Sequence, residues 1–212
     1  SCVLSGVPIL NNGTDAPQQW LLTGKATALS NWPASTTCKS LRVYKNSLIA
    51  INVTESSTNY PFMIRWSTAA DPGSVPASWD YTSATVDAGR VDVSDSLGGE
   101  LVDGLALRDS FMLYAKQAIF RMDYTGGAFV YRISKVLGAS GVLHKNCIVA
   151  IPGGYHCVFG ADDVYVHDGT SPLSILDKQT RRFLFASLDV DYAHRAFVFK
   201  NPWLNSVYIC YP

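Results

Sequence analysis

Charged side chains are scarce in this sequence of 212 residues, at 16% of the total against the ~25% typical of soluble domains. Basic and acidic residues also balance, with 17 of each and a formal net charge of zero. A neutral chain has no global electrostatic attraction to nucleic acid or to a membrane surface. No apolar run reaches the ~18 residues that indicate a transmembrane helix, so the sequence excludes such a span.

Short catalytic motifs are missing as well. HExxH, the P-loop, GxGxxG and GxSxG are all absent, and the four histidines are dispersed. His167-Asp168 is the most suggestive pair, but adjacent residues of a strand point to opposite faces. We therefore interpret it as a strand-end histidine and a turn aspartate. The sequence predicts a protein that is not an enzyme, with no catalytic, cofactor-binding or metal-binding residues and no cofactor.

Cysteine is also sparse, with five residues, an odd number, and no CxxC spacing. Cys147, Cys157 and Cys210 lie inside apolar strand patterns, where a free thiol behaves as a small hydrophobic side chain. Buried free thiols are therefore the preferred interpretation, and a disulfide framework or a zinc site is the less favoured one.

Two acidic clusters and one basic cluster are candidate binding sites. Asp162-Asp163 and Asp189/Asp191 lack the alternating oxygen ligands and the glycine of a calcium loop, so they read as turn and solvated-loop residues. The basic cluster of Lys178, Arg181 and Arg182 reads as a solvated helix face rather than a phosphate site.

What the sequence has in abundance is aromatic residues, at 12%, arranged in repeated β-hairpins. The clearest hairpin spans 155–169, where alternating apolar and aromatic residues flank a turn at 160–163. Similar patterns occur at 110–124 and 195–211, with a looser one from Ser47. A hairpin that returns every ~40–50 residues is typical of β-propeller blades. The predicted fold is all-β, with β-propeller-like blades of antiparallel hairpins and long irregular loops.

The organisation expected is a loop-rich segment at 1–40 packed on a body of partial blades at 41–212. We expect the chain to be a fragment of a larger propeller, because three or four hairpins cannot close a propeller alone. A long loop inserted at 67–107 is expected to be an ordered contact arm, because it contains Trp79 and several leucines. The only helix expected is at 174–185. The predicted core comprises Val158, Phe159, Val164, Val166, Phe197, Val198, Val207 and Ile209.

A series of short motifs runs through nearly the whole chain. They are 6–8, 11–13, 17–20, 31–34, 63–80, 87–89, 103–111, 124–127, 159–169, 181–185, 201–202 and 207–212. In this order they resemble the tail nozzle proteins, or tail tubular protein B, of short-tailed, podovirus-type bacteriophages. The resemblance implies a structural virion protein that forms a hexameric ring around the DNA channel. It also implies contacts with the tail adaptor ring, the tail fibres and the phage DNA, in a virion assembled in the bacterial cytoplasm.

Two alternatives to the nozzle remain open. A carbohydrate- or receptor-binding β-propeller module of a phage tail would use exposed Trp20, Trp32, Trp79 and Trp203 to stack on sugar rings. A glycoside hydrolase would need paired carboxylates ~5–10 Å apart. Its candidates, Asp92, Asp95 and Glu100, lie in a Gly/Ser-rich stretch without a scaffold to position them.

Overall fold

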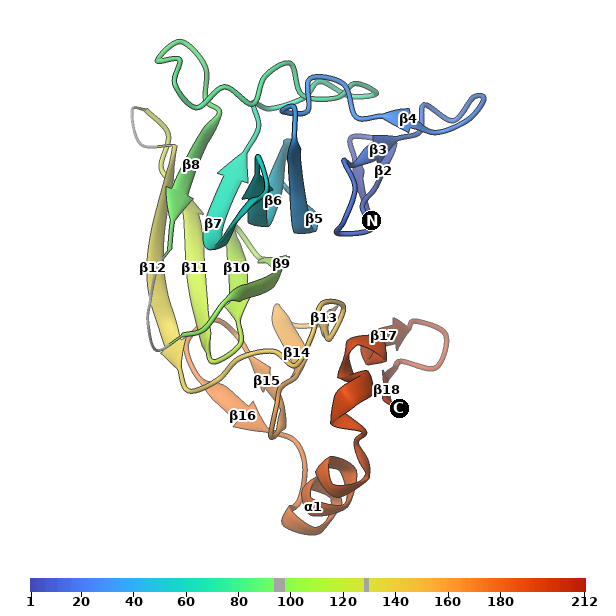
Figure 1. Ribbon diagram of the computed structural model, residues 1–212. Coiled ribbons are helices and arrows are strands. Elements are labelled where there is room, and N and C mark those ends of the chain that lie inside the picture. Colours follow the sequence, from blue (N-terminus) through green and yellow to red (C-terminus); the bar gives the residue numbers. More distant parts are fainter. Residues whose placement is uncertain (94–97, 128–129) are drawn as a thin grey trace. The chain divides into compact units, whose positions relative to one another are not determined.

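The computed structural model describes residues 1–93, 98–127 and 130–212 (Figure 1). Regular structure in these residues is almost entirely β-sheet, with an α-helix and a 3-10 helix near the C-terminus. The chain forms two compact units, one of residues 1–95 with 124–131 and the other of 96–123 with 132–212. No helix in the described part is both long and apolar enough to cross a membrane.

The first unit contains two four-stranded antiparallel sheets. Their strands are β1 (Cys2–Leu4), β2 (Val7–Leu10), β3 (Gln18–Gln19) and β4 (Thr27–Ala28), then β5 (Thr36–Tyr44), β6 (Ser47–Glu55), β7 (Thr58–Trp66) and β8 (Gly89–Asp92). Within each sheet, every strand pairs with the next one along the chain. Leu4 and Ile9 of the first sheet join Leu41 and Leu48 of the second in one buried cluster.

The second unit contains two further four-stranded sheets and a two-stranded one. Their strands are β9 (Leu101–Leu107), β10 (Ser110–Ala115), β11 (Ala118–Tyr124), β12 (Tyr131–Gly138), β13 (Ile148–Ile151), β14 (Tyr155–Phe159), β15 (Val164–His167), β16 (Pro172–Ser174), β17 (Phe197–Asn201) and β18 (Ser206–Cys210). The helices α1 (Lys178–Ser187) and η1 (Val190–Arg195) lie between β16 and β17. Again every strand pairs antiparallel with its neighbour in sequence within each sheet.

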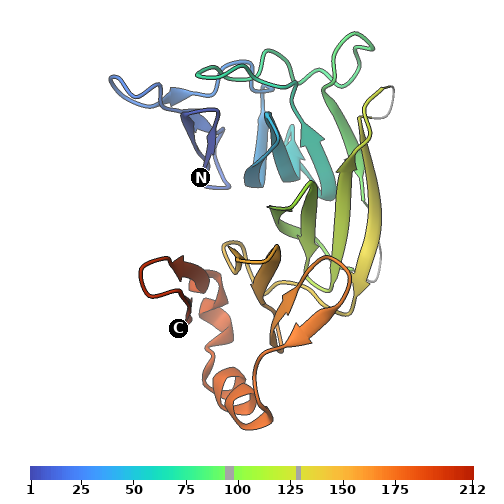
Figure 2. The same ribbon diagram turned by 180° about the vertical axis from the view of Figure 1, so that it is seen from behind.

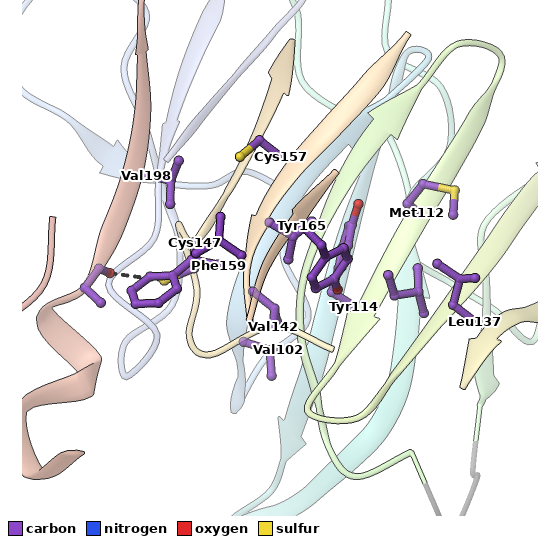
Figure 3. Packing of buried hydrophobic residues seen from close by; sticks show 14 of the residues in the cluster. Val102, Met112, Tyr114, Leu137, Val142, Cys147, Cys157, Phe159, Tyr165 and Val198 are labelled. Atoms are coloured by element: carbon purple, nitrogen blue, oxygen red, sulfur yellow. Dashed lines mark hydrogen bonds between the residues drawn. The ribbon is translucent and has the colours of Figure 1, made fainter. Parts of the chain in front are cut away.

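All three sheets contribute to the core of the second unit, which Figure 3 shows from close by. Tyr114 comes from the β9–β12 sheet, Phe159 from the β13–β16 sheet and Val198 from β17. Phe159 is fully buried, and its ring lies 5.7 Å from that of Phe185 in α1. Because side chains alternate along a strand, a single apolar face of each sheet is enough to build this core.

A four-stranded antiparallel meander that recurs along the chain is the structure of a propeller blade. The predicted all-β fold with β-propeller-like blades is therefore confirmed, and Figures 1 and 2 show the repeated meander from opposite sides. The hairpin predicted at 155–169 forms as β14 and β15, with Phe159 opposite Val164. The hairpins predicted at 110–124 and 195–211 form as β10–β11 and β17–β18.

Several expectations need correction. The region 67–107 is not one irregular loop, because it contains β8 and β9, each hydrogen-bonded into a sheet. Arg90 lies within β8 and pairs with Glu55, so it belongs to a sheet of the first unit rather than to a separate contact arm. The segment 1–40 contains a small sheet of β1 to β4, whose strands have two to four residues each. Asp95, Leu97 and Phe129 lie outside the described residues.

The predicted core is right in its centre and wrong at its C-terminal end. Val158, Phe159 and Val164 are fully buried and Val198 nearly so, while Val166 and Ile209 are half-buried. Phe197 is 44% exposed and Val207 36% exposed. Both residues belong to the two-stranded sheet of β17 and β18, where their side chains face solvent instead of a packed layer. The predicted helix begins later than expected, at Lys178, because the Asp177 carboxylate caps it by accepting from the Gln179 and Thr180 amides.

Candidate interaction surface

The residues considered for chemistry do not come together in the described part of the chain. No group of three or more His, Cys, Asp or Glu side chains there could hold a metal ion. Asp163 acts as a turn residue, since its Oδ1 accepts from the Val164 amide at 2.9 Å. Asp189 accepts from the Asp191 amide and caps η1. Asp92 and Glu100 are both exposed and belong to different units.

The basic cluster lies on the first turns of α1, as predicted for a solvated helix face. Lys178, Arg181 and Arg182 are exposed and line an open hollow of about 470 Å³. The Arg181 guanidinium lies 3.8 Å from the Asp163 carboxylate, which partly neutralises the cluster.

A buried polar network in the second unit is the feature that sequence reasoning missed. The Tyr114 hydroxyl lies 2.6 Å from Nδ1 of His156 and 2.7 Å from Nε2 of His167. Nε2 of His156 lies 2.9 Å from the Ala106 carbonyl, and Nδ1 of His167 accepts from the Gly169 amide at 3.1 Å. The two histidines and Tyr114 are all at most 1% exposed.

The partners fix the direction of every hydrogen bond in this network. The Ala106 carbonyl can only accept, so Nε2 of His156 carries a proton and its Nδ1 accepts from the Tyr114 hydroxyl. The Gly169 amide can only donate, so Nδ1 of His167 is unprotonated and its Nε2 donates to the same hydroxyl. Burial lowers the pKa of each imidazole to about 4, so both rings are neutral at pH 7. Because every polar atom of the two imidazoles is occupied and sealed from solvent, the network has a structural role.

His167 and Asp168 do not act as a pair, as the sequence analysis expected. The His167 ring points into the core, while the Asp168 carboxylate accepts from the amide and hydroxyl of Thr170 at the surface. The predicted hairpin did indicate which residue lies beside His167. With Phe159 opposite Val164, His156 falls directly opposite His167 across the two strands.

The thiols are placed as the preferred interpretation expected. None of the five cysteines forms a disulfide in the described structure. Cys147 and Cys157 are buried, and burial raises the pKa of each to about 11, so neither is a reactive thiolate. The Cys147 thiol donates a weak hydrogen bond to the Ala196 carbonyl at 3.4 Å, drawn as the dashed line in Figure 3. Cys210 is half-buried in β18.

The most unusual surface of the protein lies on β17, β18 and the turn that connects them. Six large apolar side chains are at least 36% exposed there, and we call them the aromatic surface: Phe197, Phe199, Trp203, Leu204, Val207 and Tyr208. Three of the rings form a ladder, in which Phe199 stacks on Phe197 at 6.1 Å and on Tyr208 at 5.1 Å. The ladder lies on one face of the hairpin, whereas Val207, opposite Lys200, lies on the other. Exposed apolar patches are often found where a protein contacts another molecule.

Trp203 at the tip of this hairpin is 94% exposed. Asn201 shapes the turn, because its side-chain oxygen accepts from the Trp203 and Leu204 amides. The other tryptophans proposed as sugar platforms differ. Trp20 is 39% exposed, Trp32 is half-buried, and Trp79 is wrongly placed among them, since it is 3% exposed with its ring edge-on to Trp32 at 4.7 Å.

No protein-family model and no curated protein matches the chain. Among solved structures, YCF48 from Cyanidioschyzon merolae is similar, with a TM-score of 0.47 and 12% sequence identity. The alignment covers 92% of this chain and 59% of that one, so this chain spans less than two thirds of the length of that structure. The blade-like fold therefore rests on the order and pairing of the strands.

Proposed function

We propose that this chain is a structural, non-enzymatic subunit of a bacteriophage tail nozzle. The aromatic surface is the observation that carries the assembly role: an all-β scaffold here leaves six large apolar side chains of one hairpin in water. Burying such a surface against another polypeptide is worth roughly 25 cal/mol per Å² of apolar area. The order of short motifs along the chain supports the nozzle in particular.

In this proposal the chain assembles as a homo-oligomer, with a hexameric ring as the expected form. Its neighbours are the tail adaptor ring and the tail fibres, and phage DNA passes through the lumen. The protein is then a component of the virion, assembled in the host cytoplasm. Its repeated sheets supply rigidity, while the aromatic surface supplies contact energy.

Electron microscopy of the purified protein tests the proposal. We expect rings with sixfold symmetry, and we expect Phe197→Ser with Phe199→Ser to weaken them. Phe183→Ser is a matched control, because Phe183 is 71% exposed on α1 outside the aromatic surface. Particles without sixfold symmetry at every concentration, or rings that the double variant leaves intact, would count against the proposal.

The exposure of Trp203 favours a second candidate, a carbohydrate- or receptor-binding module of a phage tail. A fully exposed indole at a hairpin tip can stack on a sugar ring. Binding to a glycan array that disappears in Trp203→Ala and persists in Trp20→Ala would support this candidate over the nozzle. Turnover of a host polysaccharide by the purified protein would instead contradict both.

A further inference from the structure

The loop that joins β3 to β4 is apolar, whereas several other hairpin turns of the chain are polar. All of its residues from 20 to 25 are exposed, and we call them the apolar tip: Trp20, Leu21, Leu22, Thr23, Gly24 and Lys25. Trp20 is 39% exposed, Leu21 53% and Leu22 60%. By contrast, only charged, amide or hydroxyl side chains occupy the turns at 45–46, 56–57, 108–109 and 116–117.

Hydrogen bonds fix the conformation of the apolar tip. The Trp20 amide donates to the Pro8 carbonyl at 3.0 Å, and the Trp20 indole donates across the loop to the Gly24 carbonyl at 3.2 Å. Figures 1 and 2 both show this connection extending beyond the strands of its own sheet. Because the indole N–H is satisfied within the loop, the ring and both leucines present hydrocarbon to the surroundings without an unpaired indole donor.

The single charge on the apolar tip is positive. Lys25 supplies it, and the sequence has no acidic residue from position 16 to position 54. The carboxylate that precedes this stretch, Asp15, accepts a hydrogen bond from the Asn12 side chain. The tip therefore combines apolar side chains with a local positive charge, which is complementary to an anionic surface.

This combination of residues fits a lipid surface better than a protein groove. Tryptophan settles at the headgroup level of a bilayer, leucine enters the acyl boundary, and lysine extends to the phosphates. A stable protein interface takes roughly 20–30 residues from each side, many more than the tip contains. Insertion into a bilayer needs no such matched surface.

We propose that the apolar tip inserts into the interface of an anionic phospholipid bilayer. Leu21 and Leu22 enter the acyl boundary, while Lys25 pairs with a lipid phosphate. One tip of this size binds weakly and reversibly, because even a whole myristoyl chain gives only marginal binding. The proposal goes beyond the nozzle function and does not rest on it. The tip belongs to the first unit and the aromatic surface to the second, so lipid binding and ring formation are tested by different variants.

Co-sedimentation of the whole chain with vesicles tests the proposal, using phosphatidylcholine alone or mixed with phosphatidylglycerol. We expect binding to the mixed vesicles, and we expect Leu21→Ser with Leu22→Asn to weaken it about tenfold or more. Asparagine suits position 22, where φ is +64°, so the variant should keep the wild-type circular dichroism spectrum. Lys25→Gln should weaken binding to the mixed vesicles about fivefold.

Leu173→Ser with Ile175→Ser is the matched control. These two side chains are 67% and 50% exposed, close to the values at the apolar tip, but they lie in the second unit. The control should bind the mixed vesicles as tightly as the wild type does. Equal loss in the control and in the tip variant would mean that exposed hydrocarbon anywhere on the protein causes the binding.

Quenching of tryptophan emission by brominated lipids identifies the residue that enters the bilayer. Quenching should occur in the wild type and in Trp203→Phe, and it should be lost in Trp20→Phe, which keeps an aromatic ring at the tip. Three outcomes would each overturn the proposal: no binding to the mixed vesicles, binding that Leu21→Ser with Leu22→Asn leaves intact or the control loses equally, or quenching that persists in Trp20→Phe.

Discussion

Tyr114 connects two sheets of the second unit through one hydroxyl group. It donates to His156 of β14 and accepts from His167 of β15, while its own strand, β10, belongs to the other sheet. Tyr114→Phe would leave two buried imidazole nitrogens without a partner, at a cost of ~1–3 kcal/mol for each. Urea denaturation should show this loss in the free energy of unfolding. Tyr155→Phe is the control, because Tyr155 is 41% exposed in the same unit. Equal stability of the two variants would contradict a structural role for the network.

The same network predicts a loss of stability in acid. Burial lowers the pKa of His156 and of His167 from 6.5 to about 4 in the folded protein. Between these values the unfolded chain binds protons that the folded chain does not, so stability falls as the pH drops from about 6.5 to about 4. A shift of this size corresponds to roughly 3 kcal/mol for one histidine.

Among the described residues, no carboxylate forms a hydrogen bond with either imidazole of the network. Burial lowers the pKa of His167, and the smaller opposing effect of Asp168, which raises it, does not compensate. Burial raises the pKa of the Tyr114 phenol, and Tyr165 of β15 and Asp103 of β9 raise it further. Denaturation at pH 7.5 and pH 4.5 measures the effect, with His194→Gln as a control at an exposed histidine. A His156→Gln, His167→Gln double variant that keeps the full acid sensitivity would refute this origin.

At this scale the sequence predicted residue environments better than residue partners. Local sequence pattern and amino-acid composition were enough to predict the thiols without disulfides, the turn role of Asp163 and the solvated cluster on α1. The Tyr114 network joins residues that are 42 and 53 positions apart. Its formation depends on how one sheet packs on another, which strand periodicity does not specify.

The hairpins are the elements that sequence reasoning recovered most fully, and they also separate buried from exposed phenylalanines. Phe159 in β14 is fully buried, whereas Phe197 in β17 is 44% exposed. Phe159→Ala should therefore cost about 3–5 kcal/mol of unfolding free energy. Phe197→Ala should cost less than about 1 kcal/mol, since little packed area is lost at an exposed site.

Chemical denaturation of both variants at neutral pH measures the difference. A large loss for Phe197→Ala would mean that the ladder of Phe197, Phe199 and Tyr208 contributes packing energy within the monomer. The sequence assigned both residues to the core because both belong to apolar strand patterns in which alternate positions face inward. Periodicity identifies the two faces of a strand, but it does not say whether a second layer covers them.

Short strands were harder to predict than hairpins. β8 and β9 were hidden in a stretch rich in Gly, Ser and Asp, and β8 has only four residues, of which Arg90 and Asp92 are charged. β8 forms because its backbone pairs with β7, from Met63 opposite Asp92 to Trp66 opposite Gly89. Such a strand is dictated by the edge that it covers rather than by its own propensity.

At the scale of the whole molecule, the blade repeat was predictable and the division into two units was not. The sequence suggested a boundary near residue 40, whereas the compact units divide near residue 95, with residues 124–131 joining the first. Residues 124–131 belong to the first unit because the Tyr131 ring packs there, 5.2 Å from the Trp66 ring and 5.8 Å from the Tyr44 ring. A contact so distant in sequence leaves no local pattern.

Tryptophan is distributed unevenly between the two units, and this gives each unit its own optical signal. Trp20, Trp32, Trp66 and Trp79 belong to the first unit, and Trp203 in the second is already 94% exposed before unfolding. Indole emission should therefore report unfolding of the first unit alone, while far-UV circular dichroism reports both units. Because the acid-sensitive histidines lie in the second unit, lowering the pH to 4.5 should move the dichroism midpoint and leave the emission midpoint nearly unchanged. Midpoints that move together would mean that both units unfold in a single transition.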